Sequence, residues 1–203
     1  MCIICIKKRG VKFPSMETVK TMCDNNNHGF ALVYNYGQGT KIFRTLNEAN
    51  FLAEYKRVKK RCSAKKTSLF IHARIKTHGT QRVENCHGWH DDECGLVFAH
   101  NGILTGVANR DDMTDSETFF RDLFLPAYAV GGWNIAKRAI QAIIGTSKFV
   151  FMDSYGTISH FGDYIEDEGL LYSNTSYVPY VPRYTTRQWS PLYNNYLDDW
   201  GLK

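Results

Sequence analysis

The sequence lacks the long apolar run that a membrane-spanning helix requires, since no stretch approaches roughly 18 consecutive apolar residues. It also lacks the pattern of a secretory signal peptide, because the short apolar run at residues 3–6 precedes the charges at 7–9 instead of following them. Internal repeats, low-complexity tracts and phosphate-binding glycine motifs are missing as well. Six cysteines without an export signal are expected to stay reduced. Together these absences predict a cytoplasmic protein without a membrane segment.

The composition is that of an ordinary globular chain. Its 203 residues are 43% hydrophobic and 22% charged, which allows one well-buried core. The formal net charge is +5, and much of the excess lies in residues 56–66, KRVKKRCSAKK. This stretch is predicted to be a solvated helix face and the loop after it. It lacks the interleaved aromatic residues that stack on bases, so nucleic acid is not the expected partner.

The apolar periodicity predicts antiparallel pairs of strands and groups of helices, a pattern typical of α+β layers. Ser15, Asn47 and Asp115 are the predicted N-caps of three helices. The expected strands are 1–6, 30–37, 40–46, 68–77, 95–104 and the arms of a hairpin over 147–162 with its turn at 154–156, and the expected helices are 15–23, 48–60, 115–128 and 133–144. A domain over residues 1–177 is therefore expected, followed by a Tyr/Trp/Pro-rich arm over 178–203.

Polar side chains interrupt three of these apolar segments. In the predicted strand HARIKTHG, alternation places His72 and Arg74 on the same face. A strand arginine is explained either by a structural ion pair or by a substrate carboxylate, which a guanidinium binds through two hydrogen bonds. The pair Asn101 and Gly102 is either a turn or two donors suited to an oxyanion. Asp115 is either a capping residue or a carboxylate that holds an ammonium group.

The order of these motifs is more specific than any one of them. Cys2 comes first, followed by HARIKTHG (72–79), ENCHG (84–88), HNGIL (100–104) and DSE (115–117). This order resembles the glutaminase domain of class II glutamine amidotransferases, which are N-terminal-nucleophile hydrolases. Two shorter matches, NHGF at 27–30 and YSN at 172–174, extend the resemblance over residues 1–176.

The resemblance implies a four-layer αββα sandwich of two antiparallel sheets between helices. It also implies removal of Met1, after which the Cys2 thiol attacks the side-chain amide of glutamine and the α-amine of the same residue acts as the base. Ammonia leaves, and water then hydrolyses the glutamyl thioester. No cofactor and no metal are implied. Cys5 falls on the opposite strand face from Cys2 and is expected to be a packing residue.

The remaining roles are implied by the same motif positions. The oxyanion would be stabilised by the Asn101 amide and the Gly102 backbone N–H. Arg74 would bind the α-carboxylate of the substrate, and Asp115 would bind its α-ammonium. Thr77 and His78 would line the pocket.

Three positions depart from the family's pattern, and they leave the amide substrate open between glutamine and a related amide. They are His28 in place of Asp, Lys76 in place of a small residue, and Gly88 in place of Pro. Amidotransferases pass ammonia to an acceptor domain, and no motif of such a domain is present. A separate acceptor subunit or a stand-alone amidohydrolase is therefore expected. Compact stand-alone relatives occur in bacteria and their phages.

Three other interpretations stay open. The first is a zinc site formed by Cys86, His87, His90 and Cys94. Zinc favours such ligands, but the spacing is not the paired C-x₂-C form. The second is a non-catalytic binding or phage-associated structural protein that retains the fold. The third, an autoprocessing hydrolase of the same superfamily, would need a propeptide, whereas only Met1 precedes Cys2.

Overall fold

The structure is a computed structural model, and it describes residues 1–75, 81–107 and 113–179. Its strands are β1 (Ile3–Lys7), β2 (Phe30–Asn35), β3 (Thr40–Thr45), β4 (Ser68–Ala73), β5 (Trp89–Asp91), β6 (Leu96–Asn101), β7 (Lys148–Met152), β8 (Ile158–Phe161), β9 (Ile165–Asp167) and β10 (Leu170–Tyr172). Its helices are α1 (Met16–Asn25), α2 (Glu48–Arg61), the 3₁₀ turn η1 (Val83–Asn85), α3 (Asp115–Thr118), the π-helical segment η2 (Phe119–Phe124) and α4 (Leu125–Ile143).

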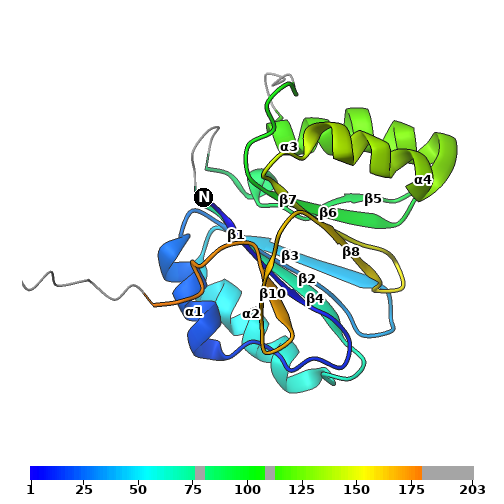
Figure 1. The fold of residues 1–203 in the computed structure, drawn as a ribbon. Helices are drawn as coiled ribbons and strands as arrows, with labels where there is room; N and C mark the ends of the chain where they lie inside the picture. The colour runs from blue at the N-terminus through cyan, green and yellow to red at the C-terminus, as the bar shows by residue number, and fades with distance from the viewer. Residues whose placement is uncertain (76–80, 108–112, 180–203) are drawn as a thin grey trace, which may run out of the picture.

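These elements form four layers. The strands pair antiparallel in two sheets, ordered β3-β2-β4-β1-β10-β9 and β5-β6-β7-β8. Helices α1 and α2 cover the outer face of the larger sheet, and α3 and α4 cover the outer face of the smaller one (Figure 1). Between the sheets, Ile4 and Phe70 pack against Val97 and Val150. This is the predicted four-layer αββα sandwich of two antiparallel sheets.

The alternation of strand β1 decides which layer each of its side chains enters. Ile3 and Cys5 pack against the helices α1 and α2, whereas Ile4 and Ile6 pack between the sheets. Cys5 is therefore a fully buried packing residue, as its position predicts. Cys2 comes two residues before Ile4, so the same alternation directs it toward the space between the sheets.

Two of the three predicted helix caps are confirmed. The Ser15 side chain accepts a hydrogen bond from the backbone of Thr18 at 2.8 Å, and Asn47 accepts one from Asn50 at 2.9 Å. The prediction for Asp115 is wrong, because the N-cap of α3 is Thr114.

The helices after α3 differ from the predicted pair. A continuous helical track runs from Asp115 through η2 into α4, and α4 crosses the predicted gap at 129–132. The backbone is nevertheless non-helical at Gly131 (φ −152°) and Gly132 (φ 55°), so the predicted gap is a kink. Strands β4 and β6 end at Ala73 and Asn101, earlier than predicted, and each ends within a polar motif.

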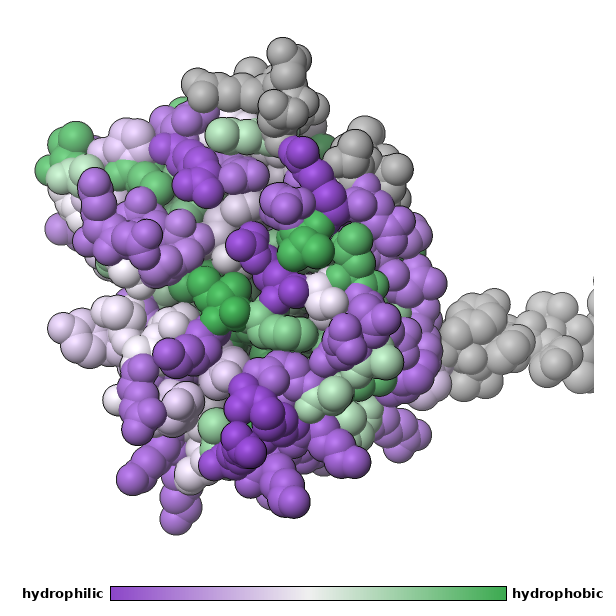
Figure 2. Space-filling view, turned by 180° about the vertical axis from the view of Figure 1, so that it is seen from behind, coloured by the Kyte–Doolittle hydropathy of each residue, from purple (hydrophilic) through white to green (hydrophobic). Residues whose placement is uncertain are grey.

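The surface carries no large apolar region on the face seen in Figure 2. Hydrophilic side chains cover most of that face, and hydrophobic side chains form separate patches. Across the described residues, no helix has the length and apolar character needed to cross a membrane. Most of the predicted arm over 178–203 lies outside the described residues, so the domain boundary at 177 stays a prediction.

Candidate active site

Cys2 lies beside the end of strand β4. Its thiol donates to the carbonyl oxygen of Ile75 at 3.6 Å, and its own carbonyl accepts from the Asn174 side-chain amide at 2.6 Å. Burial raises the pKa of the thiol, while the Ile75 hydrogen bond and the Arg74 guanidinium lower it in part. The thiol is therefore protonated at neutral pH in the presence of Met1, and a nucleophilic role would need a base.

Asn101 is joined to the strand that follows Cys2 through one serine hydroxyl. Ser173 Oγ lies 2.8 Å from the backbone nitrogen of Ile4 and 2.8 Å from Nδ2 of Asn101. The backbone N–H of Ser173 also donates to the Ile4 carbonyl at 2.9 Å. The end of β6 in the smaller sheet is thereby held to the start of β1 in the larger one.

The backbone of Gly102 passes through a space that admits no side chain. Its φ is +146°, a conformation that L residues rarely adopt. A Cβ atom there would lie 2.1 Å from Ser147 Oγ and 2.9 Å from His100 Nε2. The Asn101–Gly102 pair is thus a fixed backbone feature and more than a solvent-exposed turn.

Asp115 connects the HNGIL segment to helix α3. One carboxylate oxygen accepts from the Leu104 backbone at 2.9 Å, and the other accepts from the Ser116 backbone at 2.8 Å and the Ser116 hydroxyl at 3.1 Å. Ser116 Oγ also lies 2.7 Å from His100 Nδ1. The cap itself is supplied by Thr114, whose hydroxyl accepts from the Glu117 backbone at 3.3 Å. Asp115 is half-buried, so its carboxylate stays within reach of solvent.

Arg74 is buried, with 5% of its surface exposed, and its backbone pairs with Gly29 at 2.8 Å and His28 at 2.9 Å. Its guanidinium is close enough to lower the pKa of both Cys2 and Cys86. The other two predicted substrate-binding residues, Thr77 and His78, lie outside the described residues. The structure therefore brings Cys2 and Arg74 together at one end of β4.

A stack of buried histidines lies behind this site. The His72 and His87 rings are 3.8 Å apart at an interplanar angle of 6°, and His87 accepts a hydrogen bond from the His100 backbone at 3.0 Å. Burial lowers the pKa of His72 to about 3 and that of His100 to about 4, and it lowers the pKa of His87 as well. All three are consequently neutral at pH 7. No role was predicted from the sequence for His72 or His100, and His87 was considered only as a zinc ligand.

Sequence reasoning also gave no role to three hydrogen-bonding residues of the site: Ser116, Ser173 and Asn174. The only sequence signal for the last two was the short YSN match at 172–174.

The four residues of the zinc interpretation do not converge. Cys86 lies against Gly29 and Thr45, whereas His87 stacks between His72 and Trp89. His90 pairs with Asp92, and the Cys94 backbone donates to Asp91. In the described ranges, no group of three or more His, Cys, Asp or Glu side chains is placed to hold a metal ion.

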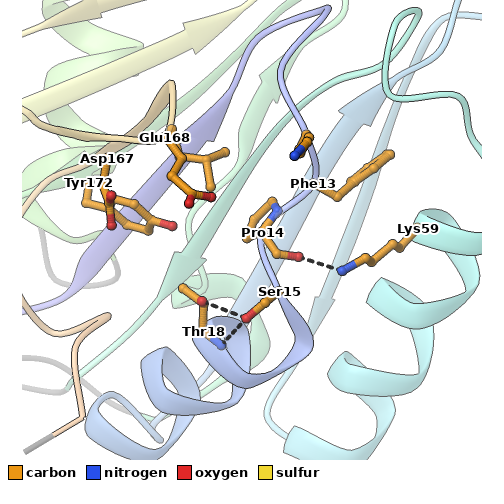
Figure 3. Close-up of a pocket in the computed structure, with 10 residues that line it drawn as sticks. Phe13, Pro14, Ser15, Thr18, Lys59, Asp167, Glu168 and Tyr172 are labelled. Atoms are coloured by element: carbon orange, nitrogen blue, oxygen red, sulfur yellow. Dashed lines mark hydrogen bonds between the residues drawn. The ribbon is translucent and has the colours of Figure 1, made fainter.

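A separate pocket lies on the helical side of the larger sheet. It is lined by the start of α1, by Lys59 of α2 and by the turn between β9 and β10, as Figure 3 shows. Lys59 donates to the Pro14 carbonyl at 2.9 Å, and Asp167 and Glu168 approach from the opposite side. None of the candidate active-site residues within the described part of the chain lines this pocket.

Comparison with solved structures identifies the fold. The chain superposes over 85% of its length on the glutamine phosphoribosylpyrophosphate amidotransferase of B. subtilis, with a TM-score of 0.58 and 15% identity, and spans 42% of that chain. It matches a structure described as the allosteric regulatory enzyme of purine biosynthesis over 75% of its length, with a TM-score of 0.53 and 16% identity, and spans 35% of that chain. A glutamine aminotransferase class-II domain protein from Silicibacter pomeroyi matches 85% of this chain and 87% of its own length, with 17% identity and a TM-score of 0.44, and no conclusion rests on it.

The chain therefore has the fold of the class II glutamine amidotransferases, an N-terminal-nucleophile hydrolase fold. It covers less than half the length of the two amidotransferase-fold chains that it matches with a TM-score above 0.5. No family model matches the sequence, and no curated protein does either.

Proposed function

We propose that the protein is a glutamine amidotransferase-type amidohydrolase that releases ammonia from glutamine or a related amide. The observation that carries the proposal is the position of the Cys2 thiol, 3.6 Å from the Ile75 carbonyl and within the field of Arg74. The Asn101 amide is linked to the same strand by a single hydroxyl. The proposed nucleophile, cationic anchor and amide donor come from three distant segments, and this arrangement supports the proposal.

The proposed reaction follows from these groups. The Cys2 sulfur bonds to the amide carbon, and the thiol proton passes to the α-amine of Cys2 once Met1 is removed. Asn101 and the Gly102 N–H stabilise the oxyanion. The C–N bond breaks as the amine returns the proton to the leaving nitrogen, which departs as ammonia. Water then hydrolyses the thioester to a carboxylic acid and restores the thiol.

The raised pKa of Cys2 supports the need for such a base. A terminal α-amine has an ordinary pKa of about 7.7–8.0, so part of it is in the neutral form at physiological pH. The carboxylate of the substrate would pair with Arg74 and its ammonium with Asp115, and Thr77 and His78 would line the same pocket. A free α-amino acid carries its carboxylate and its ammonium on one carbon, so the proposal needs the guanidinium and the Asp115 carboxylate at the same end of the pocket.

Two further parts of the proposal concern context. An acceptor domain or subunit would receive the ammonia, which is supported by the amidotransferase among the matching structures. We also propose a cytoplasmic location, which is supported by the six cysteines, all of them free thiols.

The decisive experiment measures ammonia release from glutamine by the wild type, Cys2→Ala and Cys62→Ala. Cys62 is a half-buried free thiol at the end of α2, and it serves as the matched cysteine control. We expect Cys2→Ala to abolish ammonia release and Cys62→Ala to retain it. Equal activity in all three proteins would refute the assignment of Cys2.

Intact mass spectrometry of the same preparations tests the base. We expect Met1 to be absent and a diazo-ketone analogue of glutamine to label Cys2. A retained Met1 together with no ammonia release would support the non-catalytic alternative, in which the fold is kept for binding.

A further inference from the structure

Ser173 is a hydrogen-bonding centre between the two sheets. Its hydroxyl oxygen lies 2.8 Å from the Ile4 nitrogen and 2.8 Å from the Asn101 amide nitrogen. Ser173 and Asn101 are both buried, with 5% and 3% of their surfaces exposed. Water therefore does not compete strongly for these bonds, and each buried donor and acceptor needs a partner in the protein.

The hydrogen bonds do not balance when the Asn101 nitrogen faces Ser173. In that orientation the Ser173 oxygen accepts from two N–H groups, and its own proton has no acceptor among the described residues. Oδ1 of Asn101 is then a buried acceptor without a donor among the same residues. Both a donor and an acceptor are left unpaired within one small buried cluster, which is unfavourable.

Turning the amide by 180° about its Cβ–Cγ bond pairs the serine proton and the amide oxygen, and leaves one unpaired group in place of two. The oxygen and nitrogen of an amide occupy nearly the same space, so the rotation changes no packing contact. Ser173 then accepts from the Ile4 backbone and donates its proton to Oδ1 of Asn101. Nδ2 takes the place of Oδ1, where it is an unpartnered donor on the residue that precedes Gly102.

We infer that Ser173 is a positioning residue that holds the Asn101 amide with its nitrogen turned toward the reacting oxygen. The inference rests on the proposed function, in which Asn101 stabilises an oxyanion, and it explains why that amide would be ready before substrate binds. A serine hydroxyl suits this task because it accepts from the backbone of β1 and donates to Asn101 at the same time. Ser173 itself does not touch the substrate.

A double-mutant cycle on glutamine hydrolysis tests the inference. Removing one oxyanion donor costs about 100- to 1,000-fold in kcat, which we expect for Asn101→Ala. Ser173→Ala should lower kcat by about 10- to 100-fold with KM changed less than about threefold, and Ser173→Thr should restore most of the rate. In the Asn101→Ala background, Ser173→Ala should cost less than about twofold, because the two residues act as one unit.

Asn174→Ala is the matched control. Asn174 is the neighbour of Ser173 and donates to the Cys2 carbonyl, and no hydrogen bond joins it to Asn101 among the described residues. Its effect on kcat should therefore add to that of Asn101→Ala. Additive effects of Ser173→Ala, or a loss confined to KM, would overturn the inference.

Two readouts separate this inference from the proposed function. Alkylation of Cys2 by iodoacetamide passes through no oxyanion, so Ser173→Ala should leave its rate unchanged while glutamine hydrolysis falls. If the wild type releases no ammonia, the proposed function fails. A crystal structure at about 1.2 Å resolution or better then still decides the amide orientation, because hydrogens become visible there. Nδ2 of Asn101 facing Ser173 would refute the inference.

Discussion

Replacing Gly102 with alanine should destabilise the protein by two separable effects. The new Cβ would lie 2.1 Å from Ser147 Oγ, 2.8 Å from Ser147 Cβ and 2.9 Å from His100 Nε2. Overpacking of a buried site costs about 1–3 kcal/mol. Holding a non-glycine residue in a disfavoured backbone region costs about 1–3 kcal/mol more. The expected loss in the free energy of unfolding is therefore about 2–6 kcal/mol, a large share of the stability of an ordinary domain.

Gly37→Ala is the control that isolates the backbone effect. Gly37 has φ +99°, and nothing lies within 4 Å of the Cβ that the substitution would add. This variant should lose only the backbone share, about 1–3 kcal/mol. Ser147→Ala, combined with Gly102→Ala, removes the closest contact and should recover part of the overpacking share.

Urea unfolding of the four proteins, monitored by circular dichroism, measures these differences. For a domain of this size, each kcal/mol also corresponds to about 2–4 °C in Tm, which provides an independent measurement. If Gly102→Ala were no less stable than Gly37→Ala, the close approach of Gly102 to Ser147 would be refuted. If Ser147→Ala recovered nothing in the Gly102→Ala background, the overpacking argument would fail.

Three further predictions concern the residues around the site. Arg74→Met should slow iodoacetamide alkylation of Cys2 at pH 8, because the guanidinium lowers the pKa of the thiol. An unchanged alkylation rate, followed by mass spectrometry, would show that this guanidinium does not influence the thiol. Burial lowers the pKa of His72 to about 3 in the folded protein, so the unfolded chain binds more protons below about pH 6.5 and stability falls as the pH decreases. The slope of the free energy of unfolding against pH, measured by urea titrations at pH 7, 6 and 5, should decrease by the equivalent of about one proton in His72→Phe. An identical slope in the two proteins would contradict this prediction. Thr114→Ala should cost about 1 kcal/mol of unfolding free energy and Thr114→Ser much less, since only the hydroxyl caps α3; equal losses in both would exclude a capping role.

Many helices and strands were predictable because their signals are local, whereas the four-layer arrangement came from the family resemblance. Ser15 and Asn47 mark helix starts through hydrogen bonds that span three residues. The turns between β-rich runs predict the hairpins β2–β3 and β7–β8. The cap of α3 was misassigned because Thr114 and Asp115 are both good capping residues. The Asp115 side chain turns back to Leu104, eleven positions earlier, and local pattern gives no sign of that contact.

Parts of the site were not predictable because their partners are far apart along the chain. Ser173 is separated from Ile4 by 169 positions and from Asn101 by 72. These contacts exist only because β10 pairs with β1 inside the larger sheet. Strands as short as β5, β9 and β10, with three residues each, also escape prediction by periodicity.

Strand β10 also helps to explain how a nucleophile can lie near a chain terminus and still be fixed in place. Terminal residues are usually poorly ordered unless their segment is tied into the structure. Here β1 lies between β4 and β10 inside the larger sheet, and Cys2 is held on both sides, by Ile75 through its thiol and by Asn174 through its carbonyl. On the proposed mechanism, the residue that supplies both thiol and amine must sit at the very end of the chain and yet be fixed. A central strand that begins at the site meets both requirements, and β10, the last strand among the described residues, holds that strand from one side.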